Sequence, residues 1–340
     1  MMKRYRRTVA VHTSAVMLSA CVSTRAGRIG ADDGSDACRA QLVALDSTGN
    51  FFAEDIIQGA AVGAVSGALL GGLIAAASGQ RGSNVLAGAG IGALAGGAVG
   101  AASGYYVARQ RQATDQASLN RAIAGDLALE NQQIDRTQLA FNQLMDCRFG
   151  TAQRIRADAA SGRLARPQAE AQLANLRART QADIQLAQTI NGQITQRGTE
   201  FDTAIESVAP GTKDQVLAGA RVSRAVPVQA RATVPLKLRP DPSAPNVAQI
   251  NPSEQVTLQR ASGGYALVET ASGVRGYAPA SAFPEARNLP QASNLQNASA
   301  TEGDVRSLAA TNIARRDNFT ESVSNAERLA QGQGFELATS

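Results

Sequence analysis

The chain has 340 residues, three cysteines, one histidine and a formal net charge of +5. A basic leader carries four of these charges, so the rest of the chain is close to neutral, at about +1. A nearly neutral chain gives no support to nucleic-acid binding. The single histidine, His12, lies in the same leader, so the remaining chain has no serine–histidine or cysteine–histidine pair and no histidine–cysteine cluster with metal-ligand spacing. The composition therefore argues against an enzyme and against a metal site.

Residues 1–20 have the layout of a secretory signal peptide. An uncharged, modestly apolar stretch from Thr8 to Ala20 is too short to span a membrane. It follows a group of basic residues: Lys3, Arg4, Arg6 and Arg7. We therefore expect this segment to direct export.

The signal ends in Leu18-Ser19-Ala20-Cys21, which is similar to the signature of bacterial lipoproteins. The resemblance implies that the Cys21 thiol receives a diacylglycerol, that Cys21 becomes the first mature residue with a further acyl chain, and that membrane lipid is a partner. No other cofactor is expected. Val22 and Ser23 follow the cysteine, where an aspartate commonly signals inner-membrane retention in that family, so the outer membrane is favoured over the inner one. Residues 21–55 are then a lipid-anchored segment with a short helix.

Residues 56–108 contain two segments in which glycine recurs every fourth residue. This spacing places the glycines along one side of a helix, where a second backbone can approach closely. Each segment is about long enough to span a hydrocarbon core, which needs ~20 residues. The pattern predicts a membrane hairpin that drives homo-oligomerisation, with a buried soluble helix pair as the alternative. The glycines are Gly59, Gly63, Gly67, Gly71, Gly88, Gly92, Gly96, Gly100 and Gly104.

This repeat resembles the glycine-zipper two-helix segment of bacterial surface-antigen-type envelope lipoproteins. An even number of spans returns both ends of the hairpin to the side that carries the lipid. The resemblance and the signal peptide together imply a protein whose remaining domains lie in the periplasm.

Residues 109–208 are expected to form two long helices. The first runs from Tyr105 to about Ala160, and the second begins near Pro167 and ends near Val208. Their apolar seams and short connection predict an antiparallel coiled-coil hairpin that projects as a stalk, with pairing between subunits as the alternative. Scattered carboxylates are expected on solvated faces: Asp126, Glu130, Asp135, Asp146, Glu170 and Asp183.

Two cysteines remain after lipidation of the first, and an oxidising periplasm favours a disulfide between Cys38 and Cys147. One unbroken helix from Gly104 would place Cys147 about 65 Å from the membrane, beyond the reach of a helical segment that follows Cys38. Either that helix breaks, for example near Gly125, or Cys38 lies in an extended segment, or the bond joins two chains.

After a linker at residues 209–231, short β-type runs separated by turn residues predict a small barrel at residues 232–284. Leu238-Arg239-Pro240-Asp241-Pro242-Ser243, Gly264-Tyr265, Gly276-Tyr277-Ala278 and Phe283 are similar to the conserved elements of bacterial SH3 domains. The resemblance implies an aromatic groove for peptidoglycan peptides or proline-containing protein segments. Tyr265, Tyr277 and Arg239 are the candidate groove residues, although the tyrosines could instead be core or edge residues.

Residues 285–340 are expected to hold a polar linker and a helix from about Gly303 to Gln331, which docks on the stalk or on a partner. The expected fold class is mainly α with a small all-β module: a glycine-zipper transmembrane hairpin, a long antiparallel coiled-coil hairpin, an SH3-like barrel and a C-terminal helix. The expected function is a non-catalytic envelope lipoprotein that self-associates and presents the SH3-like domain to peptidoglycan or a periplasmic protein. The alternative is an oligomeric channel or secretion-system subunit.

Overall fold

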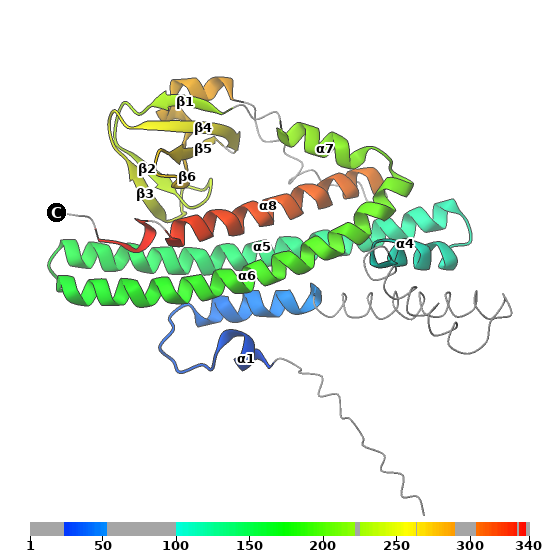
Figure 1. The fold of residues 1–340 in the computed structure, drawn as a ribbon, viewed down its shortest axis with the longest axis horizontal. Coiled ribbons are helices and arrows are strands. Elements are labelled where there is room, and N and C mark those ends of the chain that lie inside the picture. The colour runs from blue at the N-terminus through cyan, green and yellow to red at the C-terminus, as the bar shows by residue number, and fades with distance from the viewer. Residues whose placement is uncertain are drawn as a thin grey trace, which may run out of the picture.

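The computed structural model describes residues 24–52, 100–221, 225–262, 264–289, 304–331 and 333–337. Most of these residues are helical, and a small antiparallel sheet packs beside the helices (Figure 1). Among them, none of the helices combines the length and the hydropathy that crossing a bilayer requires.

The first long helix is interrupted, contrary to the prediction of one helix from Tyr105 to Ala160. Helix α4 spans Gly100–Gln112, and α5 begins again at Gln116 and runs to Ala160. The Asp115 carboxylate accepts a hydrogen bond from the Ser118 amide at 2.7 Å, and the Ser118 hydroxyl accepts one from the Asp115 amide at 3.1 Å. Such a capping box is a strong start signal for a new helix, and it explains why the chain turns here and not at Gly125.

Helix α6, Arg166–Val208, runs antiparallel to α5 after a turn in which Gly162 has a positive φ of 74°. Pro167 stands in its first turn, as predicted. Its heptad positions are all buried, which agrees with a seam that faces another helix. These positions are Leu173, Thr180, Ala187, Ile194 and Phe201.

The α5–α6 hairpin is part of a larger helical bundle and is not a bare stalk. Helix α8, Val305–Gln331, lies against both α5 and α6, and its Phe319 ring meets Phe141 edge-on at 5.8 Å between centroids. A helix over residues 39–52 packs against the hairpin near Gly49, where an added Cβ would lie 2.8 Å from Ile190. The C-terminal helix therefore docks on the hairpin, one of the two outcomes that the sequence left open.

The six strands form one antiparallel sheet in the order β1-β4-β5-β6-β2-β3. Helix α7, Thr212–Arg221, and strand β1 both lie inside the predicted linker at residues 209–231, so that segment is structured over most of its length. The burial of alternate residues explains the short β-type runs. The strands span Val226–Gln229, Val234–Lys237, Asn246–Ile250, Gln255–Ser262, Tyr265–Thr270 and Arg275–Pro279.

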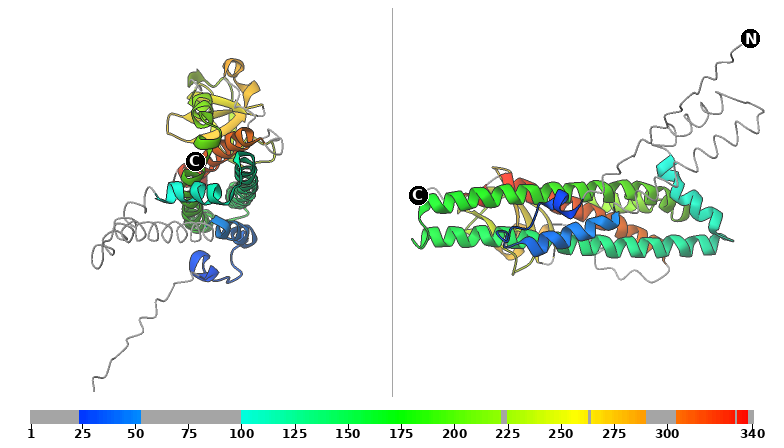
Figure 2. Two further views of the ribbon diagram at one scale, coloured as in Figure 1. Left: turned by 90° about the vertical axis from the view of Figure 1, so that its right-hand side faces the viewer. Right: turned by 90° about the horizontal axis from the view of Figure 1, so that it is seen from below.

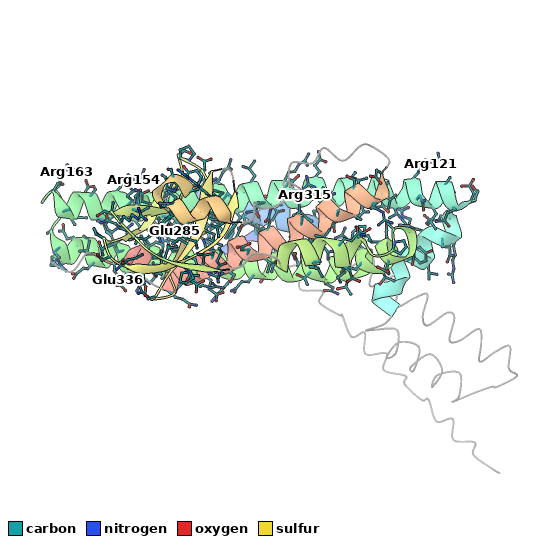
Figure 3. All side chains as sticks on the ribbon, turned by 90° about the horizontal axis from the view of Figure 1, so that it is seen from above. Arg121, Arg154, Arg163, Glu285, Arg315 and Glu336 are labelled. Atoms are coloured by element: carbon teal, nitrogen blue, oxygen red, sulfur yellow. A yellow bond between two sulfur atoms is a disulfide. The ribbon has the colours of Figure 1, made fainter. Side chains whose placement is uncertain are left out.

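We call the sheet and its two short 3-10 helices, residues 226–289, the strand module. It lies along the flank of the bundle and not beyond its end (Figure 1). Seen from above, it covers the half of the bundle that ends at Arg163, away from Arg121 (Figure 3). Helix α1, Arg25–Ile29, lies on the side of the bundle opposite the strand module, as Figure 1 and the left view of Figure 2 show.

Candidate functional site

The strand module, α5 and α8 enclose a cleft of about 560 Å³. This volume lies within the range of small-ligand sites, ~300–1,000 Å³. The strand module contributes the loop from Leu238 to Asp241 and parts of β5 and β6, while the two helices form the opposite wall. The cleft therefore exists only because the module packs against the bundle.

Apolar side chains, two of them aromatic, line part of the cleft: Phe141, Met145, Leu238, Leu267 and Tyr277. Neutral polar side chains, mostly amides and hydroxyls, line much of the rest: Gln138, Asn142, Asn318, Thr320, Ser322, Ser324 and Asn325. A mixture of apolar surface and neutral groups that both donate and accept hydrogen bonds suits an organic ligand more than a bare ion.

The arginines of the cleft already have partners within the protein. The Arg275 guanidinium donates to Glu269 at 2.6 Å, and Arg328 donates to the Ser324 hydroxyl at 3.2 Å. Arg239 forms an ion pair that crosses from the module to the bundle, with Asp146 of α5. The carboxylates of Asp241, Asp317 and Glu321 also line the cleft, so a ligand would meet charged groups of both signs.

Asn325 is the most unusual group in the cleft. Its side chain is 8% exposed, and its Oδ1 atom accepts no hydrogen bond from the described residues. Leaving a buried acceptor unsatisfied costs about 1–3 kcal/mol.

The structure brings together two of the three groove residues that the SH3 resemblance indicated. Arg239 and Tyr277 line the cleft, but Tyr265 does not, because it lies at the start of β5 opposite Pro279. The contributions of α5 and α8 were missed entirely. Asn325 lies between Val323 and Ala326, two residues of the apolar stripe of α8. A polar residue beside that stripe was the signal in the sequence that could have indicated a buried polar group.

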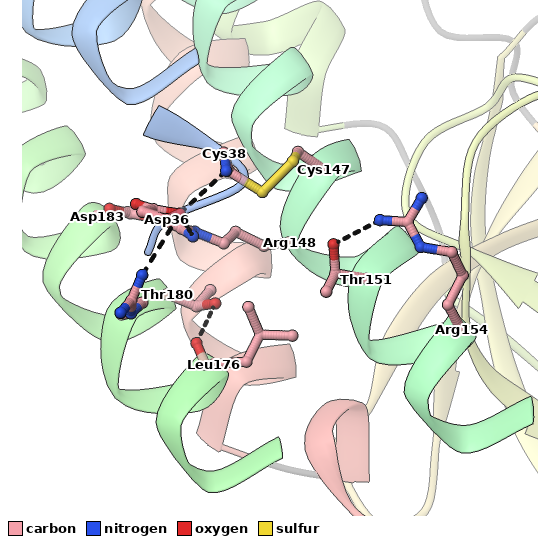
Figure 4. The surroundings of a disulfide bond; sticks show 10 residues. Asp36, Cys38, Cys147, Arg148, Thr151, Arg154, Leu176, Thr180 and Asp183 are labelled. Carbon is pink, nitrogen blue, oxygen red and sulfur yellow. Dashed lines mark hydrogen bonds and ion pairs between the residues drawn. A yellow bond between two sulfur atoms is a disulfide. The ribbon is translucent and has the colours of Figure 1, made fainter. Parts of the chain in front are cut away.

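A second polar cluster lies at the disulfide between Cys38 and Cys147, whose Cα atoms are 5.8 Å apart (Figure 4). Beside it, the Arg148 guanidinium is 2% exposed and donates to Asp183 at 2.7 Å and to Asp36 at 2.8 Å. Three charged groups and the disulfide thus hold the N-terminal segment against α5 and α6. Their contacts are satisfied within the protein, which indicates a structural role.

The pairing of the cysteines within one chain follows from the break before α5. Because the chain turns at residues 113–115, α5 does not continue the direction of α4, and the distance argument against an intrachain bond no longer applies. The helix over residues 39–52 lies along the bundle, and its N-terminal end places Cys38 beside Cys147.

Two carboxylates expected on solvated faces are in fact buried. Glu130 is 1% exposed and forms an ion pair with Arg197, while Asp183 is 3% exposed and pairs with Arg148. Burial raises the pKa of Asp183 to about 6, although the hydrogen bond from Arg148 opposes this shift. Burial also acts on Asp36, but hydrogen bonds from Arg148 and from the Cys38 amide hold the pKa of Asp36 below its usual value.

The predicted lipidation site and most of the zipper lie outside the described residues. This applies to Cys21, Gly59, Gly63, Gly67, Gly71, Gly88, Gly92 and Gly96. Gly100 and Gly104 fall in α4, whose Tyr105 ring packs on Phe201 at 5.0 Å between centroids. Within the described ranges, no group of histidine, cysteine and carboxylate side chains is placed to hold a metal ion.

Comparisons with protein-family models, with curated proteins and with solved structures found no match to this chain.

Proposed function

We propose that this protein is a non-catalytic lipoprotein of the cell envelope. Cys21 carries the acyl chains, the glycine-rich segments at residues 56–108 associate in the outer membrane, and the strand module is an SH3-like domain that binds peptidoglycan or a periplasmic protein. Homo-oligomers would then present several weak sites to a repetitive target, which raises the apparent affinity.

Three features support the envelope assignment. The Leu18-Ser19-Ala20-Cys21 run and the four-residue glycine period indicate anchoring in a membrane. The disulfide between Cys38 and Cys147 supports an oxidising compartment, because such bonds are rare in proteins that stay in the cytosol.

The observation that carries the binding role is the cleft between the strand module and the helices. Its wall includes Arg239 and Tyr277, two groove residues indicated by the sequence, and its volume suits part of a polymer chain or a short segment of a partner. The strand module, which forms one wall of the cleft, lies on the side of the bundle opposite α1 (Figure 1).

The anchoring part of the proposal is tested by fractionation and cross-linking. We expect Cys21→Ala to abolish metabolic palmitate labelling and to shift the protein away from the outer-membrane fraction of a sucrose gradient. Gly96→Leu should abolish cross-linked oligomers, whereas Ala98→Leu, on the other side of the same predicted helix, should leave them intact. Oligomers that survive Gly96→Leu would contradict the zipper.

The binding part is tested by co-sedimentation of the purified, detergent-solubilised protein with isolated peptidoglycan sacculi. We expect Tyr277→Ala to reduce the bound fraction at least tenfold, because its ring lines the cleft. Tyr265→Ala is the matched control, since that tyrosine is not among the cleft residues. Equal losses in the two variants, or no sedimentation of the parent protein, would contradict a peptidoglycan-binding cleft.

A further inference from the structure

We infer that a short tether from Cys21 holds one side of the bundle against the phospholipid headgroups, so that the bundle lies along the membrane and the strand module faces away from it. The side in question is formed by residues 24–52, and we call it the N-terminal flank. The inference rests on the proposed function, because it takes Cys21 as the acylated residue and residues 56–108 as the membrane segments. It comes from the places where the described chain connects to these anchors.

The two connections to the glycine-rich region lie close together. The described chain stops at Phe52 and resumes at Gly100. The Arg197 guanidinium lies 6.0 Å from the centroid of the Phe52 ring and 5.9 Å from that of the Phe201 ring. Tyr105 of α4 packs on Phe201 at 5.0 Å between centroids. The proposed membrane segments are therefore joined to the bundle near one aromatic cluster.

The connection to the lipid anchor is short. Cys21 is three residues before Thr24, so their Cα atoms are at most ~11 Å apart. Thr24 caps α1, which is held to the helix over residues 39–52, because Arg28 donates to Asp46 at 2.6 and 2.9 Å. Arg25 donates to the same carboxylate at 3.3 Å. The acyl chains of Cys21 must therefore enter the bilayer close to α1.

Helix α1 lies beside the middle of the bundle, which favours a lying bundle over an upright one. Gly49, three residues after Asp46, packs against Ile190 near the middle of α6. At 1.5 Å per residue, Asp46 is about 20 Å along the bundle from Phe201, where the membrane segments are joined. In an upright bundle, a tether of ~11 Å would leave Cys21 about 10 Å short of the bilayer surface. In a lying bundle, all three connections reach that surface.

The chemistry of the N-terminal flank suits contact with headgroups and not insertion into the hydrocarbon. The exposed side chains of residues 24–40 are small or polar, and this stretch has three arginines and three aspartates. It therefore has no net charge that would favour or oppose a zwitterionic headgroup layer. Because the strand module lies on the opposite side of the bundle from α1, it faces away from the bilayer (Figure 1).

Fluorescence energy transfer to a headgroup-labelled lipid tests this orientation, with the full-length processed protein in phosphatidylcholine vesicles. A cysteine that carries the donor replaces one exposed alanine at a time: Ala31 on the N-terminal flank, Ala160 at the end of α5, or Ala232 beside β2. We expect transfer to decrease in the order Ala31, Ala160, Ala232, with at least a twofold difference between the first and the last. An upright bundle would place Ala160 farthest from the bilayer. Lower transfer at Ala160 than at Ala232, or equal transfer at all three sites, would overturn the inference.

Lengthening the tether tests its role without removing any contact of the bundle. A flexible Gly-Ser insert of about twelve residues between Ser23 and Thr24 adds up to ~40 Å of reach. We expect at least a twofold loss of transfer at Ala31, whereas the same insert appended after Ser340 should leave transfer unchanged. Undiminished transfer at Ala31 in the protein with the longer tether would show that the tether does not hold the N-terminal flank to the bilayer.

The parent protein without an added cysteine separates this inference from the proposed function. Cys38 and Cys147 are paired in the disulfide, so a maleimide donor could react only with an unacylated Cys21. If the parent takes the label, or does not join the vesicles, the anchoring fails and the inference fails with it. If the parent takes no label and joins the vesicles, but the three sites give the upright order, the proposed anchoring stands and only the orientation is wrong.

Discussion

Arg239 of the strand module donates to the carboxylate of Asp146, 93 residues earlier on α5, with its Nε atom 3.2 Å from Oδ1. This pair joins the module to the bundle, and Arg239 is also one of the residues that line the cleft. A residue that the sequence assigned to ligand contact therefore also holds the two walls of the site together.

The first prediction is that Asp146→Asn loosens the module. Both side chains are partly exposed, so the pair is worth up to about 1 kcal/mol, and the loss should appear mainly as faster hydrogen exchange in residues 238–245. Asp158→Asn breaks an ion pair with Arg163 that is far more exposed, and it should leave exchange in that loop unchanged. Equal exchange in the parent and Asp146→Asn would show that the pair does not hold the module.

The second prediction concerns the disulfide. It closes a loop with a sequence separation of 109, and replacing both Cys38 and Cys147 by serine should lower the free energy of unfolding by about 2–5 kcal/mol. Urea denaturation monitored by circular dichroism measures this loss. Dithiothreitol should destabilise the parent to the level of the double variant and have no effect on that variant. A parent whose urea midpoint is indifferent to the reductant would contradict the bond.

The third prediction is a pH dependence that arises from Asp183. Its pKa is about 6 in the folded protein, against ~3.9 in an unfolded chain, so the folded state binds the proton more tightly. The contribution of this group to stability is therefore greatest at low pH and is lost as the pH rises from about 4 through 6. Urea midpoints across this range should show the decline, and Asp183→Asn should flatten it.

Asp36 has the opposite effect on the pH dependence of stability, so the contributions of Asp36 and Asp183 can be measured separately. Because its pKa is held below the usual value, its contribution is present above about pH 4 and is lost as the pH falls further. Asp36→Asn should therefore remove stability near neutral pH and leave the slope between pH 4 and 6 in place. The same slope in the parent and in Asp183→Asn would assign the titration to another group.

The fourth prediction tests packing inside the strand module. A Cβ added at Gly276 would lie 2.8 Å from the Cβ of Leu236 and 3.1 Å from the backbone oxygen of Lys237, so Gly276→Ala should destabilise the protein by about 1–3 kcal/mol. Gly192 of α6 has open space at its Cβ position, and Gly192→Ala should stabilise by about 0.5–1 kcal/mol. Thermal denaturation measures both. A neutral Gly276→Ala would show that β2 and β6 are less closely packed than described.

Some parts of the fold could be predicted because they depend on the pattern of residues that are close together in the sequence. The seven-residue recurrence from Leu173 to Phe201 identified the buried seam of α6, and alternating residues marked most of the strands. The break before α5 also has a local signal, the capping-box spacing of Asp115 and Ser118. The sequence analysis missed it because the residues on both sides have a strongly helical composition.

The candidate site was less predictable. Arg239 and Tyr277 were identified through resemblance to a known module, whereas Asn325 lies on a helix with only a modest apolar stripe. Nothing in the neighbourhood of Asn325 in the sequence indicates that a strand module will pack beside it. Similarly, Glu130 and Asp183 follow patterns typical of solvated helix faces, and their burial depends on Arg197 and Arg148.

The sequence by itself determined which segments become helices and strands and which side of α6 seeks burial, because these properties depend on residues a few positions apart. The tertiary structure decided that α8 and the helix over residues 39–52 dock on the α5–α6 hairpin, that Cys38 meets Cys147, and that the strand module closes a cleft against the bundle. The physical reason is that apolar burial is non-directional. A hydrophobic stripe in the sequence shows that one face of a helix will be buried. Only the tertiary structure shows which other element packs against that face.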